Sequence, residues 1–424
     1  MQQAFRQRAI THIIATLAAA SLATIGCATF AAELPEGTVI SKDNLDKIKN
    51  DTFMGHSIGS LLTEKVEWQI RNWNVKLPLK KGREPELDPA YVAATKKYSG
   101  QVQFDPQTRE VTGWVAGMPF PSISESDPYA GEKVLWNFYY GQPNGSSERN
   151  ENVMVLVGKN GFESSQILLF QRFKTKGRLD GSPTVGDPQI LSKTYIKMLA
   201  PEDVKGTGTY TIRYDAPAKL EDSWAYIKSA RRIRRLSGNS WTDQIGGLDI
   251  INDDVYIYNA RPSQYKQNKL IGKRWILAVT DHHNVEIPGK KETAEQFEHF
   301  ALKEPLFGIT KGVGFTPREV WVVEGTPPPE HPYSKKIVYV DTKVPVIYQG
   351  EMYDKKGDFW RFFNYHFAMV TGQTSSMQRF TYMGQETFDF KARHATLAVT
   401  QSAVPDPAGV KLSDFSPEGL ESLQ

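Results

Sequence analysis

The chain has 424 residues, of which 40% are hydrophobic and 23% charged, and this composition is typical of a soluble globular protein with a sizeable core. Its formal net charge of +3 is too small for the strongly basic face that nucleic-acid binding requires. Cys27 is the only cysteine, which excludes an intramolecular disulfide bond. No apolar run after residue 32 approaches the ~20 residues of a transmembrane helix.

Residues 1–32 predict a secretory signal peptide. Two arginines are followed by an apolar run and then by small residues, which is the order of segments in such signals. Cleavage after Ala28 or Ala31 would release a soluble protein into the periplasm. Alternatively, Cys27 ends a lipoprotein box and is lipidated, which would give an outer-membrane lipoprotein. Because Thr24 stands where such a box usually has leucine, we favour the soluble periplasmic form.

Residues 33–100 are predicted to form a helical segment that packs on a sheet. Apolar residues recur at helical spacing over residues 58–73, and shorter helices are expected at residues 43–49 and 89–98. Ser57 stands at the N-cap position of the longest helix. The surrounding Gly-x-Ser-x-Gly motif resembles a hydrolase nucleophile elbow, but that turn requires a buried strand upstream, and the preceding segment is charged and helical. We therefore interpret Ser57 as a helix cap.

Residues 101–424 are predicted to form one large antiparallel sheet, in a single globular unit with residues 33–100. Asn160-Gly161 is the strongest short hairpin signal, and it separates two apolar segments. The expected strands are residues 101–104, 110–115, 153–157, 162–173, 210–214, 223–227, 231–236, 337–340, 344–352, 359–369 and 380–390. Consecutive hairpins favour an antiparallel meander over a parallel sheet. A sheet of this size must curl or close, and one of its faces must be covered. The N-terminal helices and residues 293–301 are the candidates to cover it.

Four arginines stand in five positions on the predicted hairpin of residues 223–236. If its strands alternate, Arg232 and Arg234 share one face, and Arg231 and Arg235 share the other. Three aspartates follow shortly after it in the sequence, namely Asp249, Asp253 and Asp254. Because clustered cations need partners, we favour structural ion pairs of Arg231 and Arg235 with these aspartates. The alternative is a basic rim, at Arg232 and Arg234, that meets an anionic head group.

Aromatic residues gather on several of the predicted elements. Both faces of the strand at residues 359–369 carry them, as expected if one face meets a core and the other a cavity. Ordinary packing in a β core explains most of these residues. A concave sheet that is left open is nevertheless a natural apolar ligand site. The candidate ligand-binding residues are Trp136, Tyr139, Trp224, Tyr226, Arg232, Arg234, Trp360 and Phe362.

The histidines give no metal-binding pattern. His282 and His283 are adjacent, and neighbours on a strand point to opposite faces, so they do not readily ligate one ion together. The sequence contains no glycine-rich phosphate loop. Its only glycine pair, Gly246-Gly247, lies in a loop, and the apolar residues that follow predict a strand rather than a helix. We therefore expect neither a metal nor another cofactor.

Several motifs resemble one bacterial family. The arginine hairpin contains the pattern WxY followed by RRxRRL, and the patterns GxD and DD come after it. Four further motifs start at residues 113, 127, 335 and 353, and they read GWVAGMPFP, DPxAGxKxxWN, KKIVYVD and YDKKGDFWR. Together they cover nearly all of the mature chain and resemble a family of unknown function, often labelled outer-membrane lipoprotein-sorting-like proteins. The resemblance implies a fold similar to the Lol-type (LolA/LolB-like) carriers, an antiparallel half-barrel around a hydrophobic cavity, with helices over its concave face. It also implies RND-type exporters or outer-membrane proteins as partners.

From these features we expect a periplasmic carrier for a hydrophobic molecule, either a lipid or an acylated lipoprotein, rather than an enzyme. Its ligand would bury apolar surface in the half-barrel and keep a head group at the polar rim. One alternative is a periplasmic enzyme acting on a lipid or glycan, with Asp249, Asp253 or Asp254 as acid or base. Another is an envelope scaffold with no ligand of its own.

Overall fold

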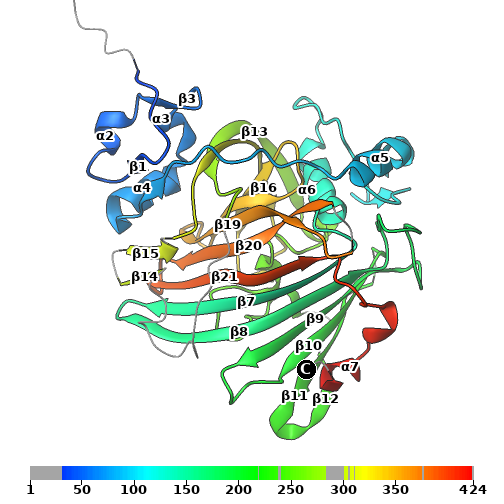
Figure 1. The fold of residues 1–424 in the computed structure, drawn as a ribbon. Helices are drawn as coiled ribbons and strands as arrows, with labels where there is room; N and C mark the ends of the chain where they lie inside the picture. The colour runs from blue at the N-terminus through cyan, green and yellow to red at the C-terminus, as the bar shows by residue number, and fades with distance from the viewer. Residues whose placement is uncertain are drawn as a thin grey trace, which may run out of the picture.

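A thirteen-stranded antiparallel sheet dominates the computed structural model (Figure 1). The structure describes residues 31–217, 219–236, 240–282, 300–303, 306–309, 311–374 and 377–422. Along the sheet the strands follow the order β12-β11-β10-β9-β8-β7-β21-β20-β19-β18-β17-β16-β13. Most neighbours in this order are also neighbours in the chain, so the sheet is a meander, and the predicted fold class is confirmed.

The strands of the large sheet are mostly longer than the sequence predicts. They are β7 (Ser147–Gly158), β8 (Gly161–Lys174), β9 (Ile190–Ala200), β10 (Gly208–Tyr214), β11 (Asp222–Ile227), β12 (Arg232–Arg235), β13 (Gln267–Ala278), β16 (Thr316–Thr326), β17 (Lys335–Asp341), β18 (Ile347–Tyr353), β19 (Phe359–Thr371), β20 (Gln378–Asp389) and β21 (His394–Pro405). At the turn between β7 and β8, Gly161 has a φ of +111°, which explains why a glycine stands there. Four of these strands, β9, β13, β16 and β21, carry no hairpin signal in the sequence.

Short elements precede and flank the sheet. Four two-stranded ladders pair β1 (Val39–Ile40) with β4 (Leu77–Pro78), β2 (Thr52–Phe53) with β3 (His56–Ser57), β5 (Gln103–Phe104) with β6 (Val111–Thr112), and β14 (Phe300–Lys303) with β15 (Leu306–Ile309). The α-helices are α2 (Leu45–Ile48), α3 (Ile58–Leu61), α4 (Glu64–Trp73), α5 (Pro89–Tyr98), α6 (Ala130–Gly141) and α7 (Gly419–Ser422).

The predicted helix at residues 58–73 is divided in two. Ser57 caps the first part, α3, because its side chain accepts a hydrogen bond from the Ser60 N–H at 3.4 Å. Thr63 starts α4 in the same way and accepts from the Val66 N–H at 3.2 Å. An extended backbone at Leu62 separates the two helices, so the apolar spacing continues across a break that the pattern alone does not reveal.

Alternate residues of the sheet face two different apolar cores. In β7, Met154 and Leu156 belong to one core, and Val153, Val155 and Val157 belong to the other. The second core is closed by α3, α4 and the strands around them, through side chains such as Ile58, Leu61, Val66 and Ile70. The N-terminal helices therefore cover the outer, convex face of the sheet.

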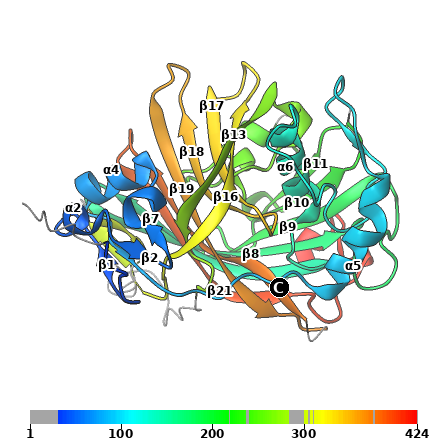
Figure 2. The ribbon, with the colours of Figure 1, turned by 90° about the horizontal axis from the view of Figure 1, so that it is seen from above.

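The concave face is covered by other elements. The helix α6 packs against β13 and β16, and residues 241–265, which we call the plug, lie across the inner face of the sheet. Figure 2 shows the sheet curving around α6. The N-terminal helices, predicted to cover the concave face, lie on the convex face instead, and α6 and the plug cover the concave one. Residues 293–301, the other candidate, lie mainly outside the described residues.

One half of the sheet closes on itself. Beyond β13, Val279 forms a parallel bridge with His366 of β19. The Phe367 N–H donates to the Val279 carbonyl at 3.0 Å, and the His282 N–H donates to the Phe367 carbonyl at 3.1 Å. The strands β13, β16, β17, β18 and β19 thereby form a small barrel, and β7 to β12 extend from it as an open, curved sheet.

Candidate ligand-binding site

The plug packs against the inner face of the sheet. Its apolar side chains Leu248, Ile250, Ile251 and Ile257 are buried in the same core as strand residues such as Met154. Ile257 lies so close to β18 that a Cβ atom added to Gly350 would be 2.3 Å from its Cγ2 atom. Where the plug packs, the concave face is therefore occupied by the protein's own chain.

The second half of the plug, residues 252–265, is held by a buried network of charged and hydroxyl groups. Lys336 of β17 lies 2.8 Å from Asp253 Oδ2 and 2.9 Å from Asp254 Oδ1, and all three side chains are fully buried. The hydroxyl of Tyr265 donates to Asp253 at 2.6 Å, and the hydroxyl of Tyr333 donates to Asp254 at 2.7 Å. The Lys336 ammonium also donates to two plug carbonyls, at 2.9 and 3.1 Å.

Charge pairing outweighs burial in this network. Burial by itself raises the pKa of Asp253, but the charge of Lys336 and a hydrogen bond with His331 outweigh it and lower the pKa to about 2. Burial likewise lowers the pKa of Lys336, and the two carboxylates outweigh it and raise the pKa. Both groups are thus held in their charged forms, which favours an anchor for the plug over an acid–base pair that exchanges protons near neutral pH.

The first half of the plug, residues 241–251, makes fewer polar contacts with the rest of the protein. The Gly246 carbonyl accepts from the Gln166 side chain at 3.0 Å, and Asp249 interacts with β21. Thr396 Oγ1 donates to Asp249 Oδ2 at 2.8 Å, and His394 Nδ1 lies 2.6 Å from the same oxygen. Gly246 and Gly247 both have positive φ angles, +50° and +79°, so the backbone there adopts a conformation that glycine favours.

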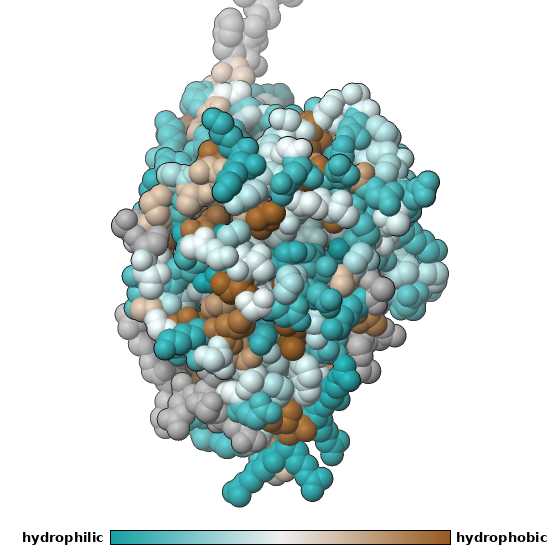
Figure 3. All heavy atoms as spheres, turned by 90° about the vertical axis from the view of Figure 1, so that its right-hand side faces the viewer, coloured by the Kyte–Doolittle hydropathy of each residue, from teal (hydrophilic) through white to brown (hydrophobic). Residues whose placement is uncertain are grey.

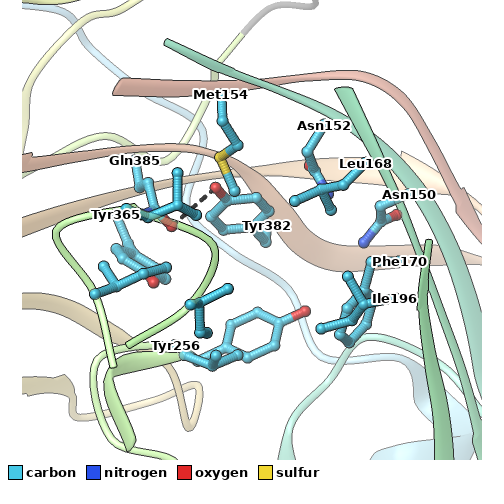
Figure 4. Close-up of a pocket in the computed structure, with 14 residues that line it drawn as sticks. Asn150, Asn152, Met154, Leu168, Phe170, Ile196, Tyr256, Tyr365, Tyr382 and Gln385 are labelled. Atoms are coloured by element: carbon cyan, nitrogen blue, oxygen red, sulfur yellow. Dashed lines mark hydrogen bonds between the residues drawn. The ribbon is translucent and has the colours of Figure 1, made fainter. Parts of the chain in front are cut away.

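A small apolar cavity of about 70 Å³ remains between the plug and the sheet (Figure 4). The sheet contributes Met154, Leu168, Phe170 and Ile196 to its wall, and the plug contributes Leu248 and its neighbours. The remaining lining residues are Asn150, Asn152, Ile245, Ile250, Val255, Tyr256, Tyr365, Tyr382 and Gln385. The cavity has room for a few water molecules and is well below the roughly 300–1,000 Å³ of typical small-molecule pockets.

One row of strand neighbours leads from this cavity to the end of the sheet. Phe170 pairs with Ile196, Ile196 with Thr209, Thr209 with Ala225, and Ala225 with Arg234. Directly opposed residues of an antiparallel ladder point to the same face, so Arg234 lies on the concave side with the cavity wall. Four strand spacings separate Phe170 from Arg234, which is ~19 Å. Between them Ile196, Thr209 and Ala225 are only half-buried.

The structure disperses the predicted ligand-binding residues. Arg232 and Arg234 lie on β12, at the far end of the row, and both are exposed. Trp224 and Tyr226 face the other side of the sheet, near α7, and Trp136 and Tyr139 belong to α6. Trp360 and Phe362 lie on β19, where Phe362 belongs to the core under the N-terminal helices. The residues that line the cavity include none of these eight.

Sequence reasoning missed the residues that do line the cavity. Met154, Leu168 and Phe170 lie in the predicted hairpin of β7 and β8, so their alternation was the available signal. Tyr256 belongs to the plug, and Tyr365 and Tyr382 belong to β19 and β20, which come next to the plug only in the folded chain. No local pattern identifies such a set.

The predicted ion pairs between the arginine hairpin and the three aspartates are wrong. Asp253 and Asp254 pair with Lys336, and Asp249 pairs with His394. Arg235 pairs instead with Asp222 of β11, directly beside it. The physical reason is that residues 252–254 form a 3₁₀ turn rather than a strand, which directs both neighbouring carboxylates into the buried core.

Two other expectations concern metals and lipidation. The described part of the chain contains no cluster of three or more potential metal ligands. His282 is buried, with Nδ1 3.1 Å from His366 Nδ1, whereas His283 lies outside the described residues.

Cys27 and most of the predicted signal peptide also lie outside the described residues. Among the described helices, none has the length and apolar composition needed to cross a membrane.

Residues 39–421 match the model of a family described as a protein of unknown function (DUF1329). The chain belongs to this family. The resemblance drawn from the sequence motifs is thereby confirmed. A comparison with curated proteins gives no match.

Solved structures with a similar course of the chain include three bacterial proteins. A putative outer membrane lipoprotein-sorting protein domain from Vibrio parahaemolyticus is 13% identical, with a TM-score of 0.46, over 70% of this chain and 100% of that chain. A DUF1329 family protein from Desulfovibrio piger is 16% identical, with a TM-score of 0.44, over 65% and 92%. A LolA superfamily protein from Nitrosomonas europaea is 11% identical, with a TM-score of 0.37, over 65% and 91%.

Proposed function

We propose that this protein is a periplasmic binding protein that carries an amphiphile, a lipid or the acyl chains of a lipoprotein, on its concave face. The row from Phe170 to Arg234 carries this proposal, because it joins an apolar cavity to a guanidinium group on one continuous surface. Arginine binds phosphate and carboxylate groups well. An apolar tail would lie toward the cavity and an anionic head group beside Arg232 and Arg234.

The dimensions of the row support such a ligand. The distance of ~19 Å between its ends compares with the ~15 Å thickness of the hydrocarbon in one bilayer leaflet, half of the ~30 Å core. Each Å² of apolar ligand surface removed from water contributes about 25 cal/mol. Release requires an acceptor that binds the ligand better, because a carrier without energy input only shifts populations. An RND-type exporter or an outer-membrane protein would be that acceptor.

Binding of a long chain also requires space that the cavity does not offer. Residues 252–265 are anchored by the network around Lys336, whereas residues 241–251 are held by Gln166, Thr396 and His394. We therefore infer that the first half of the plug moves aside for the ligand and that Gly246 and Gly247 allow its backbone to rearrange. The second half stays in place as the floor of the site.

We propose binding rather than catalysis as the activity. The aspartates considered as acid or base, Asp249, Asp253 and Asp254, are all buried and paired. Their arrangement is accounted for by holding the plug. Turnover of a lipid or glycan by the purified protein, lost in Asp249→Asn and Asp253→Asn variants that remain folded, would contradict this part of the proposal.

Native mass spectrometry of the protein purified from a bacterial envelope, followed by lipid analysis of an organic extract, tests the proposal directly. We expect a bound amphiphile in stoichiometric amount. An unliganded mass together with no uptake of added fatty acids or phospholipids would overturn the carrier function, and a co-purified protein with an empty site would favour a scaffold.

An Ile196→Trp substitution tests the position of the site. Ile196 lines both the cavity and the row, so the larger ring blocks the path of the ligand. Since overpacking costs about 1–3 kcal/mol, fatty-acid affinity in a fluorescence displacement assay is expected to fall about tenfold or more. Ile212→Trp is the matched control, because Ile212 lies on the neighbouring strand and faces the opposite side. Equal affinities of the two variants would place the ligand elsewhere.

A further inference from the structure

The hairpin of β11 and β12 carries an exposed positive charge that the protein itself does not neutralise. Residues 219–236 contain six basic and two acidic side chains. Both acidic groups are engaged, Glu221 with Arg213 and Asp222 with Arg235. Within the described residues, Arg231, Arg232 and Arg234 take part in no ion pair, and all three are exposed. Three guanidinium groups are thus available to an anionic partner.

Apolar side chains accompany these arginines. Leu220 and Leu236 are 46% and 38% exposed, although both are large aliphatic residues. Ile227 and Ile233 are half-buried; Ile233 stands between Arg232 and Arg234, and Ile227 lies opposite Arg232. At the lower end of the molecule, where Figure 1 places this hairpin, hydrophilic side chains project beside apolar atoms (Figure 3). Basic and apolar groups mixed in this way are typical of surfaces that lie in a membrane interface.

The charge is local rather than general. Two of the 51 basic residues precede residue 33, so 49 basic residues face 48 acidic ones in the rest of the chain. The turn between β9 and β10, whose Gly206 lies beside Lys228, adds Glu202, Asp203 and Lys205 and leaves a positive excess at the tip. A nearly neutral protein with a basic tip is oriented by an anionic surface.

We propose that the β11–β12 hairpin docks on an anionic phospholipid bilayer. Lys228 and Arg231 lie at the turn, Arg232 lies beside it on the concave side, and Arg234 follows on the same side. A flat anionic membrane surface can contact several of these charges at once. An acidic peptide added as a strand would instead need a long, regular edge, and β12 has only four residues. In this orientation the Arg234 end of the concave row lies next to the bilayer.

Flotation with vesicles of phosphatidylglycerol or phosphatidylcholine tests the docking. The full chain is expected to bind phosphatidylglycerol at low ionic strength and to dissociate near 1 M salt, where the Debye length is about 3 Å. Each basic residue near an anionic surface contributes about fivefold in affinity, so Arg232→Gln with Arg234→Gln is expected to weaken binding about 25-fold. Lys42→Gln with Lys96→Gln removes the same charge from exposed positions elsewhere and is expected to bind normally.

The possible results separate this docking from the proposed cargo binding. Equal binding to both vesicle types, or equal losses in the two double variants, would overturn it. Binding to a soluble acidic peptide in preference to vesicles would also overturn it and identify a protein partner. Because Ile196 is distant from the hairpin tip, Ile196→Trp is expected to dock on vesicles normally even though it loses cargo. The docking proposal is therefore tested separately from the carrier function.

Discussion

At the scale of single residues, the most consequential side chain is Lys336. Its one ammonium group lies 2.8 Å from a carboxylate oxygen of Asp253 and 2.9 Å from one of Asp254, and it donates to two backbone carbonyls of the plug. A buried pair of this kind adds little net stability compared with apolar residues, but breaking it leaves uncompensated buried charge. Lys336 therefore determines where the second half of the plug can lie.

Replacing Lys336 with methionine is expected to lower the free energy of unfolding by about 3–5 kcal/mol, because Asp253 and Asp254 lose their counter-charge in a dry environment. Urea unfolding measures the change. Lys335→Met is the control, since Lys335 is the preceding residue and forms a partly exposed ion pair with Glu324, of the kind that contributes about 0–1 kcal/mol. Similar losses in both variants would show that the buried network does not anchor the plug.

The contact of His394 with Asp249 is expected to make the plug sensitive to pH. The hydrogen bond with Asp249, opposed by partial burial, raises the pKa of His394, and Glu163 of β8 adds to the effect. Because the pKa of His394 is higher in the folded than in the unfolded protein, its contact with Asp249 contributes its full stability below the unfolded-state pKa of about 6.5. This contribution is lost as the pH rises through the folded-state pKa. Urea unfolding between pH ~6 and pH ~9 is expected to show this loss in the natural protein and not in His394→Asn. The same pH dependence in both would contradict it.

Sequence reasoning found these charged residues but not their partners. The alternation of Arg232 and Arg234 with Ile233 and Arg235 is local information, and the ladder with β11 has that alternation. The partner of Asp253 stands 83 residues further along the chain, on β17. Proximity in sequence favoured the arginines, and only the folded chain brings Lys336 closer.

At the scale of elements, the plug and α6 decide the form of the site. Both contain aromatic and β-branched residues, which favour strands by local preference. In α6 ten of the twelve residues are buried, so tertiary packing on β13 and β16 outweighs that preference. In the plug, positive φ angles at Tyr256 and Ile257 prevent a regular strand. Neither element was predictable from periodicity.

A Gly350→Ala substitution tests how tightly the plug is seated on the sheet. The added methyl group would lie 2.3 Å from Ile257 Cγ2, so one of the two elements must shift. We expect a loss of about 1–3 kcal/mol in urea unfolding and faster proteolysis within residues 241–265. Gly100→Ala is the control, because nothing lies within 4 Å of a Cβ atom there. Unchanged proteolysis would mean that the plug has room to adjust.

At the scale of the whole molecule, the hairpin signals in the sequence predict the antiparallel meander but not which of its strands close into a barrel. Turn residues such as Asn160 and Gly161 determine which strands pair locally. The bridge between Val279 and His366 joins segments 87 residues apart, and it depends on how far the sheet curls. Curvature accumulates over many strands, so no short stretch of sequence records it. The division into a closed barrel and an open sheet therefore appears only in the complete structure.

Because of this division, the two edge strands of the sheet differ in whether another strand pairs with them. Beyond β13 the chain pairs back onto β19, whereas β12 has β11 as its sole strand neighbour in the described part of the chain. An unpaired edge attracts strands of other molecules and is a common start of aggregation. Two copies meeting at β12 would bring rows of arginines opposite each other, and like charges in that position repel. The strand is also too short to offer many hydrogen bonds. The same arginines that face outward therefore keep copies of the protein apart.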